Sequence, residues 1–371
     1  MNKRTRSGQA TAAMLGRPSV RRDGRPRLCG RARPQARGTV TLWFLLTFTA
    51  LLMIGAFAID LPRVFTVGGE LQNGADAAAL AGAGALSQGG ASGPNWAGAA
   101  SSATAAIALN TSDGTKLSSG TVSAGYWDVA ASSPTLLAPG NVTLPAPAGK
   151  LLEPAVQVTI SRNATSNGGL VHLLLGTMLG MPTTPETATA VAVIAPPSAV
   201  PAGGLFPMVM DQCVYNQYWD LTKNAPKVNA AGQPQEFTIG NGQEYGASCE
   251  AAQWTSFLVV ANDTPTVVNL IDNGNPTPLS IGDNIYIEPG VKAAVYKSIP
   301  VGSTVVMPVS TQIENKTYVP IMAFAAFHID TADQGGKIIT GHFVAGYTIP
   351  TQGTGVSATN YGAYVAPRLG L

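Results

Sequence analysis

The sequence predicts an α+β protein. It would begin with an N-terminal transmembrane helix that an Ala-rich helix extends, followed by a small α/β segment and a mostly β, sandwich-like C-terminal domain. Three observations carry this prediction: an uncharged apolar run near the N-terminus, small residues at helical spacing after it, and alternating strand patterns between turns rich in Gly, Pro and Asn. With 371 residues, the chain is long enough for two ordinary domains.

The apolar run extends from Thr39 to Ile59 without a charged residue or a proline. A helix of that length spans roughly 30 Å, which is the hydrocarbon thickness of a bilayer. Two alternatives are a buried helix of a soluble protein and a cleavable signal peptide. A signal peptide has a shorter apolar stretch that ends at small residues, whereas Asp60 and Leu61-Pro62-Arg63 follow this run. We therefore expect a retained transmembrane helix at 39–59.

Charge is distributed unevenly along the chain. Residues 1–38 carry eleven Lys and Arg residues and one Asp, and the rest carries 11 basic and 19 acidic residues. Short segments rich in Lys and Arg stay in the cytoplasm, so we expect a disordered cytoplasmic arm at 1–38 and export of 60–371. The arm has no aromatic residue that could stack on bases. Membrane lipid is therefore an expected partner of the arm, and nucleic acid is not.

Residues 60–110 form an Ala-rich helical stalk in this interpretation. Apolar and small residues recur there at helical spacing, and Arg63, Glu70, Asn73 and Asp76 fall largely on the other side. Small residues allow a second helix to approach closely. The 60–88 helix could therefore mediate oligomerisation, or it could pack on its own domain. The recurring positions are Leu61, Val64, Phe65, Gly68, Leu71, Ala75, Ala78, Ala79 and Gly82.

The remaining chain divides into a small α/β exported segment at 111–200 and a β-rich exported domain at 201–371. The apolar stretch 170–179 predicts a short buried helix in which His172 is a packed core residue, and the composition of 195–204 predicts a linker. A helix is expected over 95–110. Strands are expected over 122–129, 155–161, 188–194, 257–261, 284–288, 304–309, 321–329 and 337–347.

The stretch from Arg37 to Leu86 contains an extended motif. It reads Arg-Gly, an apolar span, an Asp two before a turn residue, an Arg, and then ELQNGADAAALAGA from Glu70 to Ala83. This pattern resembles the N-terminus of TadG-like proteins of the tight adherence (Flp) pilus assembly system of bacteria. Its helix-packing residues in this chain are Glu70, Leu71, Gln72, Asn73, Ala75, Asp76, Ala79 and Gly82.

The resemblance continues more loosely to the C-terminus and implies a Tad-like C-terminal region. It implies a non-enzymatic, membrane-anchored component of Flp/Tad pilus assembly, whose partners are other Tad pilus assembly proteins. It also implies a single-pass protein of the bacterial cytoplasmic (inner) membrane. Two departures limit what is carried over. No Asp-x-Ser-x-Ser metal site occurs, and Trp43 stands where a prepilin has Glu at the fifth position after Gly38, so we expect a retained anchor rather than a polymerised pilin.

Cysteine usage agrees with this topology. Cys213 and Cys249 lie in the exported region, where disulfides persist. We expect them to be paired, which would stabilise the fold by roughly 4 kcal/mol in the chain-entropy model; two buried free thiols are the alternative. Cys29 lies in the arm and should stay reduced.

Catalytic signals are weak. His328 and His342 flank an acidic turn with Asp330 and Asp333, so a hairpin could bring them together, with Asp330 as a partner or metal ligand. Strand residues that face water are the alternative. No nucleophile elbow, phosphate-binding loop or His-Glu-x-x-His motif occurs. We expect no enzymatic activity and no cofactor. The rival functions are a periplasmic adhesin or ligand-binding module and, less favoured, an anchored hydrolase.

Overall fold

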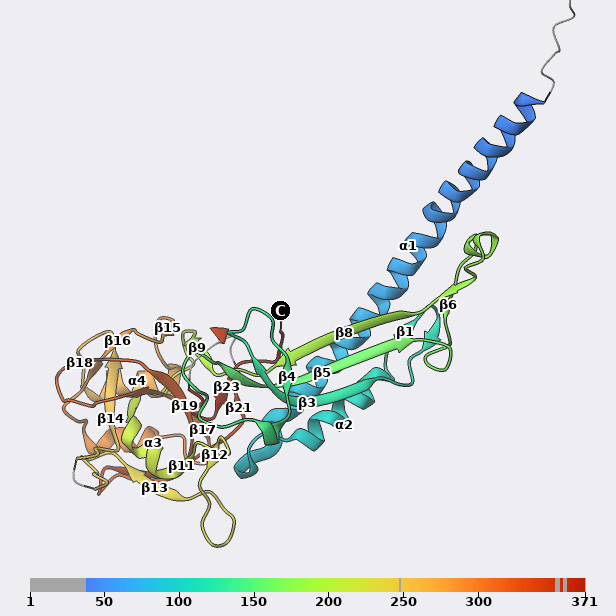
Figure 1. Ribbon diagram of the computed structural model, residues 1–371. Coiled ribbons are helices and arrows are strands. Elements are labelled where there is room, and N and C mark those ends of the chain that lie inside the picture. The colour runs from blue at the N-terminus through green and yellow to red at the C-terminus, as the bar shows by residue number, and fades with distance from the viewer. Residues whose placement is uncertain (1–37, 247, 351–353, 356–358, 371) are drawn as a thin grey trace, which may run out of the picture. The chain divides into compact units, whose positions relative to one another are not determined.

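The computed structural model describes residues 38–246, 248–350, 354–355 and 359–370, and it divides into two units, Met1–Leu52 and Met53–Leu371. The basic arm predicted at 1–38, with Cys29, lies outside the described residues except for Gly38. Helix α1 (Thr39–Leu86) is continuous through the apolar run and the Ala-rich stretch, with Pro62 inside it (Figure 1). The predicted α+β class is confirmed.

Helix α1 is long and apolar enough to cross a membrane. The most apolar window of the helix has a mean hydropathy of 2.3, and 6% of that window is buried. An exposed apolar helical segment such as 39–59 is stable in hydrocarbon because its backbone hydrogen bonds are all internal. α1 is thus a candidate single-pass membrane anchor.

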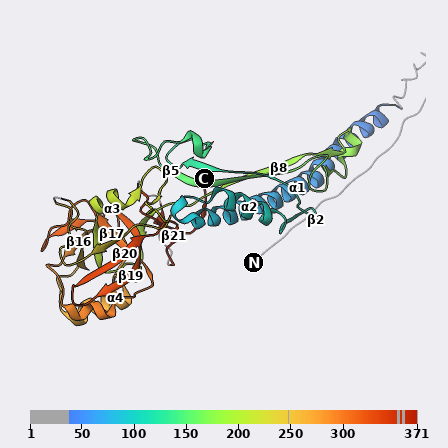
Figure 2. The ribbon, with the colours of Figure 1, turned by 90° about the horizontal axis from the view of Figure 1, so that it is seen from below.

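A five-stranded antiparallel sheet lies against the second half of α1. Its order is β24-β8-β5-β3-β4, and α2 (Trp96–Ile107) lies with α1 on the same side of β5 and β8 (Figure 2). The 3₁₀ turn η1 (Ser87–Ser92) joins the two helices, and the side chain of Asn95 caps α2 by accepting from the Gly98 amide. The strands are β3 (Thr121–Asp128), β4 (Leu136–Leu137), β5 (Leu152–Arg162), β8 (Glu186–Val193) and β24 (Arg368–Leu369).

Strict alternation gives this sheet its apolar face. Val156, Val158 and Ile160 on β5 point into one core with α1 and α2, and Ala155 points into a small cluster on the other face. Successive strand residues face opposite sides of a sheet, so the pattern that predicts strand 155–161 also orients it toward the helices.

The prediction for 170–179 is wrong. The segment contains the hairpin strand β6 (Val171–His172), which pairs with β7 (Thr183–Thr184), and the 3₁₀ turn η3 (Gly176–Leu179) at its tip. His172 is exposed rather than packed in a core. The apolar composition suggested burial inside the protein, but the segment is an outlying tip beside α1.

An eight-stranded mixed sheet forms the centre of residues 205–371. Its order is β13-β20-β19-β17-β10-β14-β16-β18, and β10 and β17 are its parallel pair. Two short helices, α3 (Gln212–Tyr218) and α4 (Thr264–Asn273), and the 3₁₀ turn η4 (Ala293–Ser298) accompany it. The strands are β10 (Met208–Asp211), β13 (Glu236–Ile239), β14 (Ala252–Phe257), β16 (Asn284–Ile287), β17 (Thr304–Ser310), β18 (Tyr318–Pro320), β19 (Ala323–Asp333) and β20 (Ile338–Phe343).

Both faces of this sheet are covered. Phe324 on β19 points into a core shared with the three-stranded sheet of β9 (Pro197–Val200), β15 (Leu279–Ser280) and β22 (Thr354–Gly355). Its neighbour Phe327 points into the opposite core, which α3 and η4 help to close. Sandwich-like packing is therefore found on one face, and helical elements cover the other.

Two further predictions need correction. The expected linker at 195–204 contains β9, because its Pro and Ser residues occupy a short strand next to β15. The expected strand at 257–261 is displaced, since β14 ends at Phe257. The remaining short pairs are β1 (Thr111–Ser112) with β2 (Thr115–Lys116), β11 (Trp219–Asp220) with β12 (Ala225–Pro226), and β21 (Tyr347–Thr348) with β23 (Ala363–Tyr364).

Candidate functional site

The small-residue motif of α1 packs within its own chain. Leu71, Ala75, Ala79 and Gly82 are buried in the core formed with α2 and the five-stranded sheet. A Cβ atom placed on Gly82 would lie 2.9 Å from the Cβ atom of Ala103, so the helices approach as closely as glycine allows. The sequence leaves open whether this helix face mediates oligomerisation or packs on its own domain. In the structure, it packs on its own domain.

The polar residues of the same motif join α1 to neighbouring segments. The Glu70 carboxylate accepts a hydrogen bond of 2.6 Å from the backbone amide of Asp113. The Gln72 amide donates to Asp76 at 2.7 Å and to the backbone carbonyl of Thr189 on β8 at 3.3 Å. Asn73 is exposed. Small apolar and polar side chains of the motif therefore both stabilise the contact between α1 and the five-stranded sheet.

An ion-pair cluster continues this join toward the N-terminal end of α1. Asp113 lies 3.1 Å from the Arg63 guanidinium and 3.5 Å from that of Arg162. Arg162 is buried and also donates to the backbone carbonyl of Ser112 at 2.9 Å. A buried guanidinium requires such partners to offset its lost hydration.

Asp60 is a site residue that the sequence argument misses. Its carboxylate accepts hydrogen bonds from the backbone amides of Leu174 at 2.7 Å, Leu175 at 3.0 Å and Gly176 at 2.6 Å. The residue is only 7% exposed, although it directly follows the apolar run. Charge-assisted hydrogen bonds to several amides are the usual way in which a buried carboxylate is stabilised. The available signal was the aspartate of the TadG-like pattern.

The predicted cysteine pair forms a disulfide. Cys213 at the start of α3 is bonded to Cys249, with Cα atoms 5.8 Å apart and a sequence separation of 36. Tyr215 lies beside it and stacks on Trp219 at a ring separation of 5.0 Å. Tyr215 also donates a hydrogen bond to the backbone carbonyl of Asn360, so the stapled segment contacts the C-terminal residues.

The histidine hairpin brings its candidates together. His328 and His342 are paired across β19 and β20, with ring centroids 5.1 Å apart. The Nδ1 atom of His342 lies 2.8 Å from the Asp330 carboxylate, while the Nε2 atom of His328 lies 3.9 Å from it. Within the described part of the chain, no group of three or more His, Cys, Asp and Glu side chains is arranged to hold a metal ion. The arrangement thus orients His342, and Asp333 instead caps the turn at Gly335.

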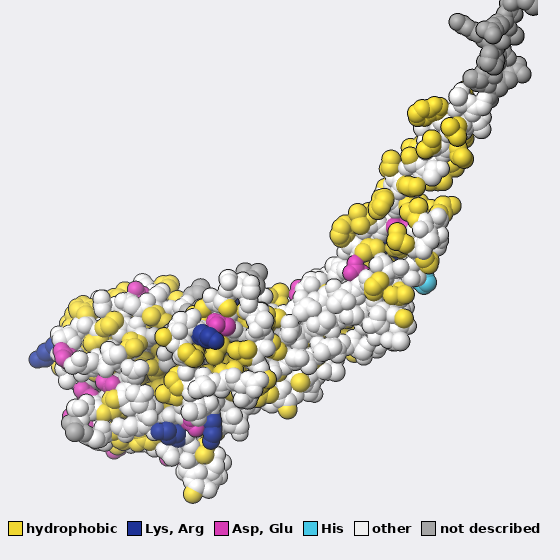
Figure 3. Space-filling model, viewed as in Figure 1, with side chains coloured by type: hydrophobic (Ala, Val, Ile, Leu, Met, Phe, Trp, Pro, Cys, Tyr) yellow, Lys and Arg dark blue, Asp and Glu magenta, His cyan; other side chains and the backbone are white. Residues whose placement is uncertain are grey.

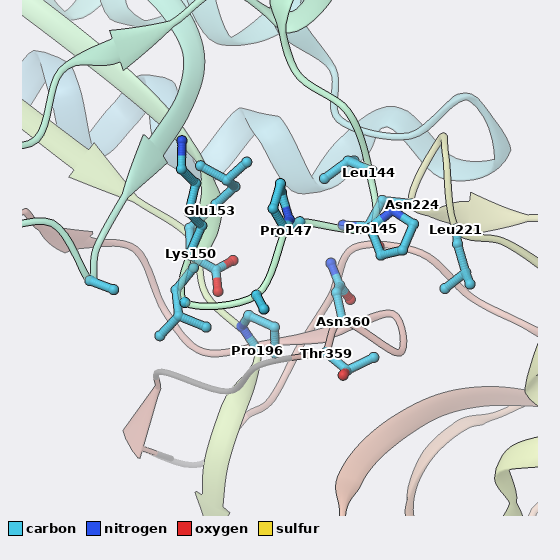
Figure 4. Close-up of a pocket in the computed structure, with 16 residues that line it drawn as sticks. Leu144, Pro145, Pro147, Lys150, Glu153, Pro196, Leu221, Asn224, Thr359 and Asn360 are labelled. Carbon is cyan, nitrogen blue, oxygen red and sulfur yellow. The ribbon is translucent and has the colours of Figure 1, made fainter.

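A cavity of about 530 Å³ lies beside β5, and its wall is rich in proline (Figure 4). Glu153 lines it and is buried. Burial raises the pKa of the Glu153 carboxyl well above its ordinary value, and the Arg368 guanidinium opposes that rise only in part. Burial, with a smaller contribution from Glu153, also raises the pKa of Tyr126 to about 12. The raised pKa favours the protonated form of this carboxyl, which can donate a hydrogen bond. The other labelled residues are Leu144, Pro145, Pro147, Lys150, Pro196, Leu221, Asn224, Thr359 and Asn360.

These features define a class of protein: a membrane-anchor candidate whose single long helix is also the spine of an α+β domain. Residues 38–85 match a family model described as Flp pilus-assembly TadE/G-like, and residues 81–192 match one described as Tad-like Flp pilus-assembly. Residues 38–192 are therefore similar to Tad-like Flp pilus-assembly proteins. Residues 193–371 lie outside both matches, so the looser resemblance there stays a prediction. No curated protein and no solved structure matches the chain.

Proposed function

We propose that this chain is a non-enzymatic, membrane-anchored component of Flp/Tad pilus assembly that acts through protein–protein contacts outside the bacterial cytoplasmic membrane. One observation carries the proposal. Helix α1 is at once the apolar span and the buried spine of the region that matches the pilus-assembly families. Anchor and exported domain are thus one continuous element, which suits a part that must hold a fixed position beside an assembling fibre.

The proposed orientation puts the basic arm in the cytoplasm and 60–371 outside. The concentration of Lys and Arg before the span supports it, and the Cys213–Cys249 disulfide is compatible with an oxidising compartment. A reporter enzyme that is active only outside the cytoplasm, fused after residue 371, should be active. The same reporter fused at residue 38 should be inactive. The reverse pattern would contradict this orientation.

The proposed partners are other Tad pilus assembly proteins and membrane lipid, with no role for nucleic acid. Oligomerisation through the 60–88 helix remains part of the proposal, but it would have to use the face that carries the exposed Gly69 and Asn73, because Ala75 and Ala79 are buried in the chain's own core. The division into arm 1–38, span 39–59, stalk 60–110, segment 111–200 and domain 201–371 is likewise proposed.

The test is deletion of the coding region in its own host, with surface fibres scored by electron microscopy. Loss of fibres, restored by a wild-type copy, is the expected result. Normal fibres and normal adherence in the deletion strain would reject the pilus role. Normal fibres with lost adherence would instead favour the adhesin or ligand-binding module, whose candidate is the unmatched 201–371 region.

A second complementing copy addresses the hydrolase alternative. It carries His328→Ala and Asp330→Asn, which remove the hydrogen-bonded hairpin cluster. Restoration of fibres by this copy supports a non-enzymatic role. Failure to restore them, with the variant present at wild-type amounts in the membrane, would favour catalysis by the histidine cluster.

A further inference from the structure

The tip of the β6–β7 hairpin exposes an unusual amount of apolar side chain. Residues 173–182 contain no charged residue. Within this tip, Leu174 is 63% exposed, Met178 is 70% exposed and Met181 is 58% exposed. Large side chains of this kind, gathered on one projecting turn, are typical of a surface that contacts another apolar phase.

The tip lies against the end of the apolar run. The three amides that bind the Asp60 carboxylate belong to Leu174, Leu175 and Gly176. An open pocket of about 490 Å³ lies between the tip and α1, and Ala56 and Phe57 of the apolar run line it. The tip therefore sits beside the last turns of the candidate membrane span.

The neighbouring part of α1 is apolar and exposed as well. Phe57 is 65% exposed, and Phe65 is 69% exposed. The face in Figure 3 carries hydrophobic side chains along α1 and over the adjoining tip, in contrast to the mainly polar and backbone surface beyond them. Residues 60–65 extend the helix by about 9 Å past the apolar run, which is comparable to the headgroup layer of a bilayer.

The ionisable groups near the tip are either paired or lie outside residues 173–182. Asp60 is buried and its oxygens are occupied by the three amides. Arg63 forms an ion pair with Asp113, and the ionisable residues His172 and Glu186 lie outside residues 173–182. Apolar side chains on the span side and ionisable groups away from it give the distribution of an element at a membrane interface.

We propose that the 173–182 tip is a second membrane contact, which inserts its Leu and Met side chains into the leaflet next to α1 while Asp60 holds the tip to the helix. The tip would contact lipid, because its apolar surface is continuous with that of the span. Two contacts at one membrane surface would restrict rotation and tilt of the exported domain, whereas a single helix alone leaves both free. The inference rests on anchoring by α1 and not on a role in pilus assembly.

The test uses the full chain in phospholipid nanodiscs, with Cys29→Ser so that one introduced cysteine takes a nitroxide label. The label is placed by Met178→Cys at the tip. The matched control is Val260→Cys, an apolar residue 62% exposed in the turn after β14. The Cys213–Cys249 disulfide stays oxidised and unlabelled. The measurement is the collision rate of each label with oxygen, which concentrates in the bilayer, and with a nickel chelate, which stays in water.

We expect the ratio of oxygen to nickel collisions to be several-fold higher at residue 178 than at residue 260. Equal ratios at the two positions would overturn the proposal, because the tip would then lie in water. Protection of residue 178 from both reagents would overturn it as well, since protein, such as a second copy of the chain, would then cover the tip. If the proposed role in pilus assembly were rejected, the expected collision rates at the two positions would stay the same.

Discussion

The two cores of this chain are built from different side chains. The core of α1, α2 and the five-stranded sheet consists mainly of Ala, Val, Ile and Leu, and Gly82 provides its closest helix approach. The core of the eight-stranded sheet that contains α3 is rich in aromatic rings, including Tyr215, Trp219 and Phe343, and lies next to the disulfide. Small side chains hold backbones close together and leave little room to adapt. Large rings bury more area each, and a cross-link adds stability without any helix contact.

The difference corresponds to the family match. The small-residue core lies mainly in the part matched to pilus-assembly families, and the aromatic core lies in the unmatched residues. The chain end nevertheless joins them, because β24 pairs with β8 and Tyr364 is buried in the small-residue core. We infer that the matched region fixes the geometry at the membrane and that the other region is stabilised largely by its own contacts.

The largest expected effect is loss of the disulfide. Replacing Cys213 and Cys249 together with alanine should lower the free energy of unfolding of the aromatic region by about 2–5 kcal/mol, because the unfolded chain gains entropy. Cys29→Ser is the control and should leave stability unchanged. The measurement is thermal unfolding by tryptophan fluorescence in nanodiscs. An equal loss of stability in the control, or no loss in the double variant, would show that the disulfide does not stabilise the aromatic core.

Asp60→Asn should come next, with an effect confined to the tip. Hydrogen bonds to a charged acceptor contribute about 1.5–3 kcal/mol, so exchange of the 174–176 amides should become roughly 10- to 100-fold faster. Hydrogen–deuterium exchange with mass spectrometry on the full chain measures it. Asp76→Asn is the matched control on the same helix, because the Asp76 carboxylate accepts a hydrogen bond from Gln72 on α1 itself and does not contact the tip. Unchanged exchange in Asp60→Asn would show that other contacts hold the tip.

Two glycines of α1 provide the sharpest test of the small-residue core. Gly82→Ala should destabilise the protein by about 1–3 kcal/mol, because its new methyl group overlaps Ala103 and the carbonyl of Ala99. Gly69→Ala meets nothing within 4 Å and should stabilise by about 0.5–1 kcal/mol through helix propensity. Both are measured by thermal unfolding in nanodiscs. If the two variants behave alike, close packing at residue 82 is not what holds this core.

Elements that depend on periodicity could be predicted from the sequence. The continuous helix 39–86 and the strand at 155–161 follow from residues that sit at regular spacing along the chain. Strand 257–261 was misplaced because its apolar run, Leu258 to Val260, is exposed in a turn, while the buried strand before it contains polar residues such as Gln253. Local composition does not show which of two adjacent segments finds a partner strand.

The contacts of Asp60 could not be predicted, because the sequence does not show which distant segments lie close together in the fold. Asp60 and Gly176 are 116 positions apart and meet only because the β6–β7 hairpin extends back along α1. The apolar stretch 170–179 favoured a buried helix since burial in protein and burial in lipid demand the same residues. The sequence indicated a hairpin that could bring His328 and His342 together, but their direct pairing depends on a register shift between Ile329 and Thr331, which the turn residues do not show.

The last prediction concerns Glu153 and depends on pH. Burial raises its pKa in the folded state above the ordinary value of 4.5, so the folded protein holds a proton that the unfolded chain has lost. Stability from this group is therefore complete below pH 4.5 and declines as pH rises through the raised pKa, by at most about 1.4 kcal/mol per pH unit. Glu153→Gln should remove that decline and stabilise the protein near pH 7, as measured by thermal unfolding between pH 4.5 and pH 7. Glu236→Gln changes an exposed residue in the aromatic region and should leave the pH dependence as it is. A decline that persists in Glu153→Gln would mean that the pH dependence comes from groups around the aromatic core, such as Asp211, whose pKa burial also raises.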